Sequence, residues 1–253
     1  MIIVKIGGAV ATDAKLLSAL LEDFAGSKGQ PFVLVHGGGR EVTAVSEKFG
    51  LKAEFREGIR LTSRAEMEVV DMVLGGKINI DLVRRAQASG LDAVGVGGQD
   101  GGLFTGEPRA FEGRKDSRTG RVTNTRTRLL KVLTDEGFFP IVHSTSMDAG
   151  GEGLNINADE AAQELAIACH AEALVFISDI AGVLKNQVVL PRLDQASIAA
   201  EIASGVISGG MVPKVQNASQ AVEAGVGKVV IGGYQNTGDL KRLLSGASGT
   251  TII

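Results

Sequence analysis

The chain has little cysteine, few aromatic residues and no excess of positive charge. Cys169 is the single cysteine among 253 residues, which excludes an intrachain disulfide and a cysteine-based metal cluster. Tryptophan is absent and aromatic residues make up 4%, so platforms for stacking bases are not expected. Lysine and arginine total 26 against 29 acidic residues, for a net charge of -3. We therefore expect no nucleic-acid partner, because such binding needs a basic face.

Long apolar runs are also missing. No stretch approaches 18 consecutive apolar residues, so we expect no membrane-spanning helix and no membrane partner. Residues 1–5 lack the basic region and the apolar stretch of a secretory signal. These absences predict a cytoplasmic protein. Hydrophobic residues at 44% and charged residues at 22% are typical of a globular chain that buries a core.

Short runs rich in valine and isoleucine alternate with longer segments of helical periodicity. We predict strands over residues 2–6, 32–35, 93–96, 139–143, 173–178, 228–231 and 250–253. We predict helices over residues 16–24, 40–49, 63–88, 126–136, 158–169, 195–204 and 210–224. The helix over 63–88 has a weak point at Gly75 and Gly76, and residues 101–124 are typical of hairpins and loop.

This alternation of strands and helices predicts parallel strand pairing with helices on both faces of a sheet. The expected class is α/β, a three-layer αβα sandwich with a mostly parallel central sheet. We expect one domain over residues 1–253, with an N-terminal lobe over about 1–154 and a C-terminal lobe over about 155–253.

Glycine is abundant, at 35 residues against five prolines, and it clusters where predicted strands end. Gly7 and Gly8 follow the strand that carries Lys5, and three glycines follow His36. Ligands of open parallel sheets bind at the carboxyl ends of strands, where glycine lets backbone N–H groups face an anion. One such cluster is more simply a tight turn. Two clusters, one of them beside a lysine, favour phosphate or carboxylate binding.

The common nucleotide-binding motifs do not fit this chain. The pattern G-x-G-x-x-G fails because Asp100 stands where the last glycine belongs, and neither the P-loop pattern nor the protein-kinase set is present. A bound nucleotide is therefore expected to be held in another way.

Six segments resemble the amino acid kinase family, in its order and spacing, and span nearly the whole chain. They are residues 4–8 (VKIGG), 35–39 (VHGGG), 58–62 (GIRLT), 154–159 (LNINAD), 178–183 (SDIAGV) and 209–214 (GGMVPK). Segments 58–62 and 154–159 are more specific, and resemble the members that act on N-acetyl-L-glutamate. The loop at residues 185–187 is shorter than the family often has, which leaves the adenine contacts open.

The resemblance implies transfer of a phosphoryl group from ATP, which carries Mg²⁺, to the side-chain carboxylate of N-acetyl-L-glutamate for arginine biosynthesis. The product is an acyl phosphate. The reaction class suits the composition, because a carboxylate is already deprotonated at pH 7 and needs no general base, and the chain has only three histidines. Holding two anions together and neutralising charge is work for lysines, backbone amides and Mg²⁺.

The resemblance also implies residue roles. Lys5 and Lys214 would flank the transferring phosphoryl group, and Asp159 would orient their ammonium groups. Arg60 would pair with the α-carboxylate of the acceptor, and Asn155 would hydrogen-bond it. Backbone N–H groups would come from Gly8, Gly38 and Gly39. The nucleotide site would be lined by Gly7, Gly8, Asp179, Ile180, Ala181, Gly182, Val183, Leu184, Val206, Ile207, Ser208 and Gly210.

Each role competes with a simpler interpretation. Lys5 alone could extend to solvent, Asp159 could cap a helix, and Arg60 could be a surface charge. Lys214 lies near a helix start, where a cation is disfavoured unless a phosphate lies beside it.

Two other functions stay open from the sequence. A relative within the family phosphorylates aminoadipate on an acidic carrier protein, and the basic stretch over 109–128 could dock such a partner. The chain could instead be a non-catalytic sensor of amino acids or nucleotides, although a sensor need not keep Lys5, Asp159 and Lys214. Since the chain starts directly with the first strand, we expect a homodimer without strong arginine inhibition.

Overall fold

The computed structural model describes residues 1–27, 29–56, 59–112 and 116–253. Gly58, Arg114 and Lys115, which the sequence analysis singled out, lie outside the described residues. The chain forms two compact units. Unit 1 contains Met1–Phe32 and Ala162–Ile253, and unit 2 contains Val33–Ala161. The division into an N-terminal and a C-terminal lobe stays a prediction.

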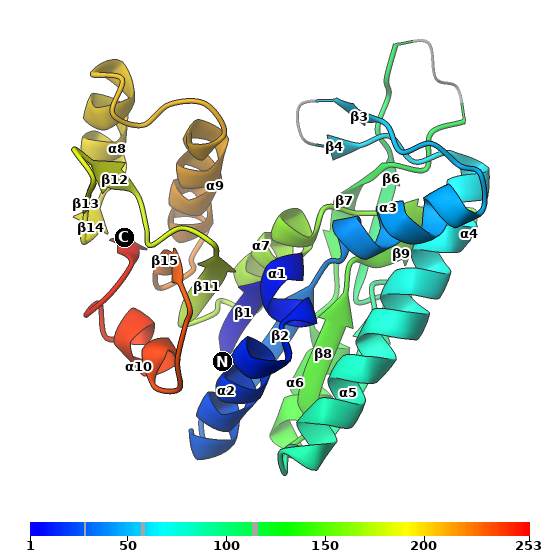
Figure 1. Ribbon diagram of the computed structural model, residues 1–253, viewed down its shortest axis with the longest axis horizontal. Helices are drawn as coiled ribbons and strands as arrows, with labels where there is room; N and C mark the ends of the chain where they lie inside the picture. Colours follow the sequence, from blue (N-terminus) through cyan, green and yellow to red (C-terminus); the bar gives the residue numbers. More distant parts are fainter. Residues whose placement is uncertain (28, 57–58, 113–115) are drawn as a thin grey trace. The chain divides into compact units, whose positions relative to one another are not determined.

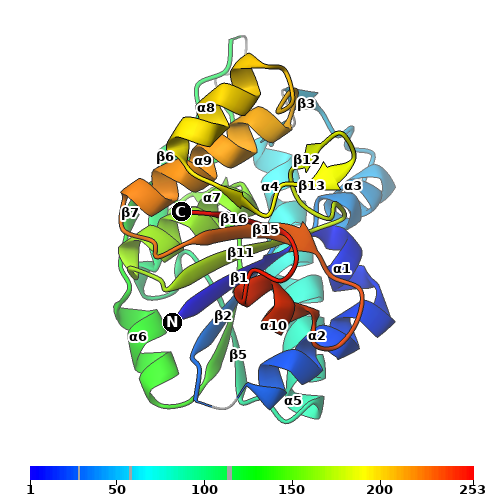
Figure 2. The same cartoon turned by 90° about the vertical axis from the view of Figure 1, so that its left-hand side faces the viewer.

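The strands of unit 1 are built around a fully apolar central strand. This strand, β11 (Ala173–Ser178), pairs in parallel with β1 (Ile2–Ile6) and with β15 (Val229–Gly233). Next to β15 runs β16 (Thr250–Ile252), which is antiparallel to it and parallel to β14 (Arg192–Leu193). Figure 2 shows β1, β11 and β15 side by side. Continuous Val, Ile and Leu runs in β1 and β11 fit strands that are buried on both faces.

The helices of unit 1 connect these strands. They are α1 (Gly8–Thr12), α2 (Ala14–Gly26), α8 (Gln195–Ala203), α9 (Met211–Glu223), α10 (Asp239–Leu244) and most of α7 (Ala158–Ala168). Asp13 caps α2 by accepting hydrogen bonds from the N–H groups of Lys15 and Leu16, which satisfies donors that the first helical turn leaves open. Residues 185–188 turn the short hairpin of β12 (Leu184–Lys185) and β13 (Val188–Val189).

In unit 2, β8 (Phe139–His143) pairs in parallel with β2 (Phe32–His36) and with β5 (Ala93–Gly97). Its helices are α3 (Gly39–Lys48), α4 (Arg64–Asp71), α5 (Asn79–Ala88) and α6 (Arg128–Asp135), with a short turn of 3₁₀-helix over Asp100–Gly102. Three hairpins complete the unit. They are β3 (Phe55–Arg56) with β4 (Ile59–Arg60), β6 (Phe104–Pro108) with β7 (Gly120–Thr125), and β9 (Thr145–Met147) with β10 (Gly153–Asn155).

The helix predicted over 63–88 is present, but its middle is not an α-helix. Between α4 and α5 the segment η1 (Met72–Ile78) is a π-helix, and the N–H of Asn79 donates to the carbonyl of Leu74, five residues back. The wider turn contains Gly75 and Gly76, the predicted weak point. Such π-helical turns occur often at functional sites.

The predicted fold class is confirmed, because the structure is mixed α/β with a large, mostly parallel sheet and helices between its strands. Among the described residues, no helix is long and apolar enough to cross a membrane.

Candidate functional site

Lys5 and Lys214 both lie against Phe176 in unit 1. Lys5 of β1 is the register partner of Phe176 on the parallel strand β11, and register partners project from the same face of a sheet. From α9, Nζ of Lys214 lies 5.9 Å from the centre of the Phe176 ring. The two lysines, 209 positions apart in the sequence numbering, are therefore brought to one face of one strand. Such a concentration of positive charge suits a site that binds a polyanion.

The glycines that follow Lys5 have no packing reason to be glycine. A Cβ atom added at Gly7 or Gly8 would meet no other atom within 4 Å. Neither residue adopts a positive φ, so the fold would accept a side chain at both. Their bare backbone leaves open space directly after the strand that carries Lys5, as the anion-binding hypothesis requires.

The segment after β11 is folded tightly by a threonine. Oγ1 of Thr250 accepts a hydrogen bond from the N–H of Val183 at 2.8 Å and donates to the carbonyl of Leu190 at 2.7 Å. Gly182 has a φ of 151°, and a Cβ there would lie 2.8 Å from Oγ1 of Thr250. Glycine is thus required by the turn at this position. Val183 is buried and Leu184 is exposed, so of these two side chains only Leu184 is available to a nucleotide.

Glu201 on α8 brings the two predicted nucleotide segments together. Its carboxylate accepts from Nζ of Lys185 at 2.6 Å, and its backbone carbonyl accepts from the N–H of Ile207 at 3.0 Å. Ile207 is itself buried. The segment 206–210 then leads into α9, which begins at Met211 and carries Lys214. Residues 179–184 and 206–210 are therefore tied to neighbouring parts of unit 1.

In unit 2 the second glycine cluster combines a packing role with open space. A Cβ at Gly38 would lie 2.2 Å from Cδ1 of Ile78, whereas a Cβ at Gly39 would meet no atom within 4 Å. Gly38 is therefore glycine because the π-helix packs against it. Gly39 begins α3 with open surroundings, which fits a predicted contact with a ligand.

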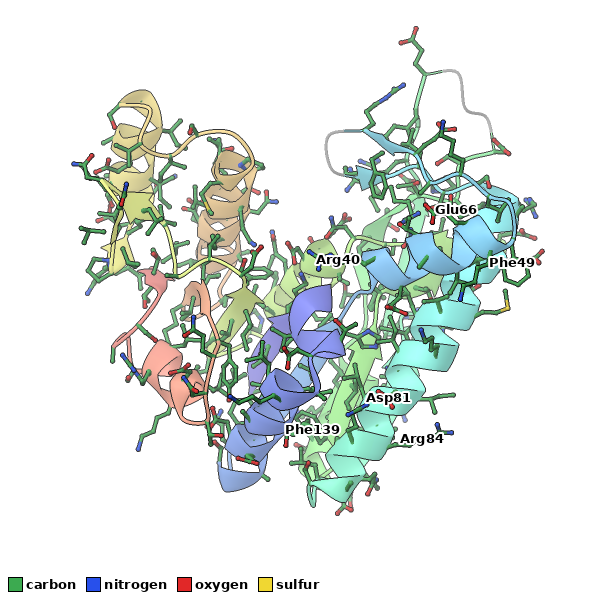
Figure 3. The ribbon with its side chains drawn as sticks, in the orientation of Figure 1. Arg40, Phe49, Glu66, Asp81, Arg84 and Phe139 are labelled. Atoms are coloured by element: carbon green, nitrogen blue, oxygen red, sulfur yellow. The ribbon has the colours of Figure 1, made fainter. Side chains whose placement is uncertain are left out.

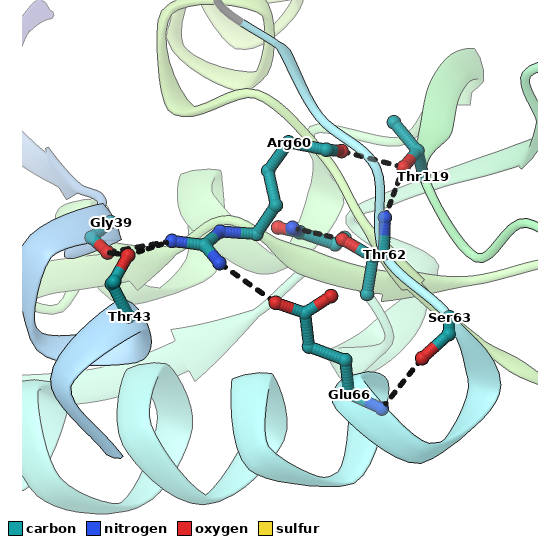
Figure 4. Close-up of polar contacts among 8 residues, drawn as sticks. Gly39, Thr43, Arg60, Thr62, Ser63, Glu66 and Thr119 are labelled. Atoms are coloured by element: carbon teal, nitrogen blue, oxygen red, sulfur yellow. Dashed lines mark hydrogen bonds and ion pairs between the residues drawn. The ribbon is translucent and has the colours of Figure 1, made fainter. Parts of the chain in front are cut away.

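Arg60 is buried and held by acceptors from two helices, so the simpler interpretation of a surface charge is wrong. Its Nη1 donates to Glu66 at 2.7 Å, and its Nη2 donates to the carbonyl of Gly39 at 2.9 Å and to Oγ1 of Thr43 (Figure 4). The guanidinium also lies 4.7 Å from the centre of the Phe55 ring. Five N–H groups are available on an arginine, and the described contacts use three of them. Donors remain for an anion such as a carboxylate.

Asn155 joins the same network through hydroxyl groups. Its Nδ2 donates to Oγ1 of Thr62 at 2.8 Å. Oγ1 of Thr119 accepts from the N–H of Thr62 and donates to the carbonyl of Arg60 at 2.7 Å, as Figure 4 shows. The structure thus brings together Gly39, Arg60 and Asn155, three of the four residues predicted to bind the acceptor.

Asp159 lies in the first turn of α7, where Asn157 performs the capping. Oδ1 of Asn157 accepts from the N–H of Asp159 at 2.8 Å. The Asp159 carboxylate is therefore not needed as the cap, although a negative charge in the first turn of a helix is stabilising in itself. Its neighbour Glu160 is occupied, because it accepts from Arg109 at 2.6 Å and from the N–H of Val122 at 2.8 Å.

Two histidines lie side by side where the strands of unit 2 end. His36 and His143 are register partners on β2 and β8, and both are buried. Burial lowers the pKa of His36 to about 4 and lowers the pKa of His143 as well. Gly97, the register partner of His143 on β5, leaves room for the imidazole, since a Cβ there would lie 2.2 Å from Cε1 of His143. Both rings are therefore neutral at pH 7.

The sequence analysis missed Glu66 and Asn79. Glu66 occupies the third position after the cap Ser63, which suggests a helix-capping role. Ser63 does accept from the N–H of Glu66, but the Glu66 carboxylate turns to Arg60 instead (Figure 3). Asn79 is a polar residue on the buried side of α5, and a buried amide on an apolar stripe was the signal that could have identified it.

Within the described ranges, no group of three or more His, Cys, Asp and Glu side chains is placed to hold a metal ion. A magnesium ion that accompanies ATP belongs to the substrate.

Comparison with known proteins agrees with this arrangement. The sequence model of the amino acid kinase family matches residues 1–233, and the chain belongs to this family of phosphotransferases. Its curated relatives include an acetylglutamate kinase from Nostoc sp., 38% identical over 89% of this chain and 77% of that protein. The acetylglutamate kinase from Rubrobacter xylanophilus is 37% identical over 99% of this chain and 96% of that protein. The crystal structure of smu.665 from Streptococcus mutans superposes with a TM-score of 0.80 at 27% identity, covering 99% and 97% of the two chains.

Proposed function

We propose that this protein transfers the γ-phosphoryl group of ATP to the side-chain carboxylate of N-acetyl-L-glutamate, a step of arginine biosynthesis. A carboxylate oxygen forms the new bond to the γ-phosphorus, and the bond from that phosphorus to the bridging oxygen of ADP breaks. The products are an acyl phosphate and ADP. The observation that carries the proposal is the placement of Lys5 and Lys214 on one face of β11, beside Phe176, in a chain whose relatives are acetylglutamate kinases.

The chemistry asks for position and charge more than for proton transfer. The attacking carboxylate is ionised at neutral pH, and His36 and His143 are buried and neutral. Two ammonium groups, together with the magnesium ion of MgATP, would neutralise the charge that spreads over the phosphoryl oxygens in the transition state. The open backbone at Gly7 and Gly8 would supply N–H groups to the same oxygens. We assign the nucleotide to residues 179–184 and 206–210.

The acceptor would be recognised by Arg60, Asn155 and Gly39. Arg60 keeps donors for the α-carboxylate, and its orientation is fixed by Glu66 and Thr43, so little side-chain entropy is lost on binding. Asn155 is fixed in the same way by Thr62. The proposed roles of Asp159, toward the ammonium groups, and of Gly38, toward the phosphoryl group, complete the assignment.

The carrier-protein alternative is less well supported than free acetylglutamate. The described arginines of the basic stretch are paired within the chain. Arg109 pairs with Glu160, Arg118 with Asp148 and Arg121 with Glu107. Paired charges attract an acidic partner more weakly than unpaired ones.

A panel of acceptors tests the function. Hydroxylamine converts an acyl phosphate to a hydroxamate, so trapping in the presence of MgATP reports the product directly. We expect product with N-acetyl-L-glutamate and much less with glutamate, aspartate or free aminoadipate. Product only with carrier-bound aminoadipate would favour the alternative acceptor, and binding of both substrates without any product would favour a sensor. A homodimer stays a prediction, checked by light scattering of the purified protein.

A further inference from the structure

The buried pair of His36 and Asn79 is not used by the chemistry described above, yet it contacts the second glycine cluster. Nδ1 of His36 lies 3.0 Å from the carbonyl oxygen of Gly37, and Nε2 lies 3.0 Å from Nδ2 of Asn79. Nδ2 of Asn79 is also 2.9 Å from the carbonyl oxygen of Ile141 on β8. Both side chains are buried. The pair therefore links β2, β8 and α5 to the first residue of the cluster.

These contacts fix where the proton of His36 lies. The carbonyl of Ile141 can only accept, so the Asn79 atom that faces it must be the amide nitrogen and not the amide oxygen. That nitrogen has only donors, and therefore Nε2 of His36 accepts. The proton of the neutral ring then lies on Nδ1 and is donated to the carbonyl of Gly37. The low pKa of His36, about 4 because of burial, agrees with a neutral ring.

The Gly37 carbonyl in turn sets the direction of the next N–H group. The described peptide bonds are all trans, so the carbonyl of Gly37 and the N–H of Gly38 are part of one planar unit and point in opposite directions. Anchoring the oxygen to His36 aims the Gly38 N–H away from the ring. Gly38 is held from a second side by Ile78, the residue before Asn79, because its α-carbon packs against that side chain.

The surrounding sequence makes room for this arrangement. A Cβ at Gly95 would lie 1.9 Å from Oδ1 of Asn79, so glycine on β5 is needed for the Asn79 side chain to fit. The π-turn at η1 ends at Ile78, and the N–H of Asn79 is bonded to the carbonyl of Leu74. Ile78 and Asn79 thus follow the wide turn directly, and both contact the segment from His36 to Gly38.

We propose that His36 and Asn79 are positioning residues for phosphoryl transfer, which aim the Gly38 N–H at the migrating group. The inference rests on the proposed function, since it takes Gly38 as a donor to the phosphoryl oxygens. A misplacement of about 1 Å at such a donor lowers turnover by up to about 10²-fold. Neither residue touches substrate in this account.

Two substitutions separate the two hydrogen bonds of the ring. In His36→Asn the amide nitrogen occupies the position of Nδ1 and keeps the bond to Gly37, but the side chain is too short for Asn79. In His36→Gln the amide reaches Asn79, and Gly37 loses its donor. We expect His36→Gln to lower kcat about 10-fold to 100-fold with a smaller change in KM, and His36→Asn to recover most of the loss. The matched control is His170→Asn, at an exposed histidine with a φ of 45° that asparagine tolerates.

The ring proton itself is measured by ¹⁵N NMR of the imidazoles, with His36→Gln and His170→Asn assigning the three histidines. A neutral His36 protonated on Nδ1 supports the inference, and protonation on Nε2 overturns it. Equal thermal destabilisation of both His36 variants with unchanged kcat would show a purely structural role and would also overturn it. Absence of turnover in the wild type with every acceptor would refute the proposed function instead, and the NMR result would still decide the hydrogen-bond direction.

Discussion

At the scale of single residues, Lys5 and Lys214 show how context changes the meaning of a side chain. A lone lysine at the end of an apolar strand ordinarily extends to solvent, and a lysine near a helix start is disfavoured by the helix dipole. Here both are half-buried and lie against Phe176. An anion bound beside them would offset the mutual repulsion of the two ammonium groups.

Removing either amine should therefore reduce turnover strongly. We expect Lys5→Ala and Lys214→Ala each to lower kcat by about 10²–10³, the loss typical of one preorganised charge stabiliser. Steady-state kinetics with saturating MgATP and acetylglutamate measures this. Lys15→Ala, at an exposed lysine on α2, serves as the control and should keep wild-type turnover. Wild-type kcat in either test variant would show that its lysine has been misassigned.

His36 predicts how stability depends on pH. Its pKa is about 4 in the folded chain and 6.5 in the unfolded chain, so between these values the unfolded chain binds a proton that the folded chain does not. The free energy of unfolding should fall as the pH drops from about 6.5 to about 4, by on the order of 3 kcal/mol from this residue. Urea unfolding across this range measures the slope, and His36→Gln should flatten it. An equal slope in the variant would contradict the assignment.

At the scale of elements, most helices and strands could be predicted, because their periodicity is strong. The strands at 2–6, 139–143 and 173–178 match the structure at both ends. The π-turn in η1 could be suspected only as a weak point at Gly75 and Gly76, since its hydrogen bonds depend on packing against His143 and Gly38. The two-residue strands β3, β4, β12 and β13 were not predicted, because so few residues carry no periodic signal.

The two glycines at the start of α3 should respond differently to alanine. Gly38→Ala places a methyl group 2.2 Å from Cδ1 of Ile78, so we expect a loss of about 1–3 kcal/mol in stability from overpacking. Gly39→Ala meets open space and should leave stability nearly unchanged while lowering turnover, because the new methyl group occupies space proposed for the ligand. Denaturant unfolding and kinetics on both variants check this. Equal stability losses would contradict the packing argument.

At the scale of the whole molecule, the residues of the site come from segments far apart in the chain. The sequence analysis could identify Lys5, Arg60, Asn155 and Lys214 through the resemblance to a family, but not by periodicity. It could not reveal that Glu66 orients Arg60, or that Glu201 ties Lys185 to Ile207. Such links depend on which elements meet in the fold, and a single sequence does not encode them as a local pattern.

The central claim is that the amines of Lys5 and Lys214 act on one phosphoryl group. A crystal structure of the protein with MgADP, aluminium fluoride and N-acetyl-L-glutamate tests it most directly, because the planar fluoride mimics the group in transfer. We predict Nζ of both lysines within hydrogen-bonding distance of that group, about 2.7–3.2 Å, with the glutamate side-chain carboxylate in line with it. A complex in which only one lysine contacts the fluoride, while the other points to solvent, would contradict the account.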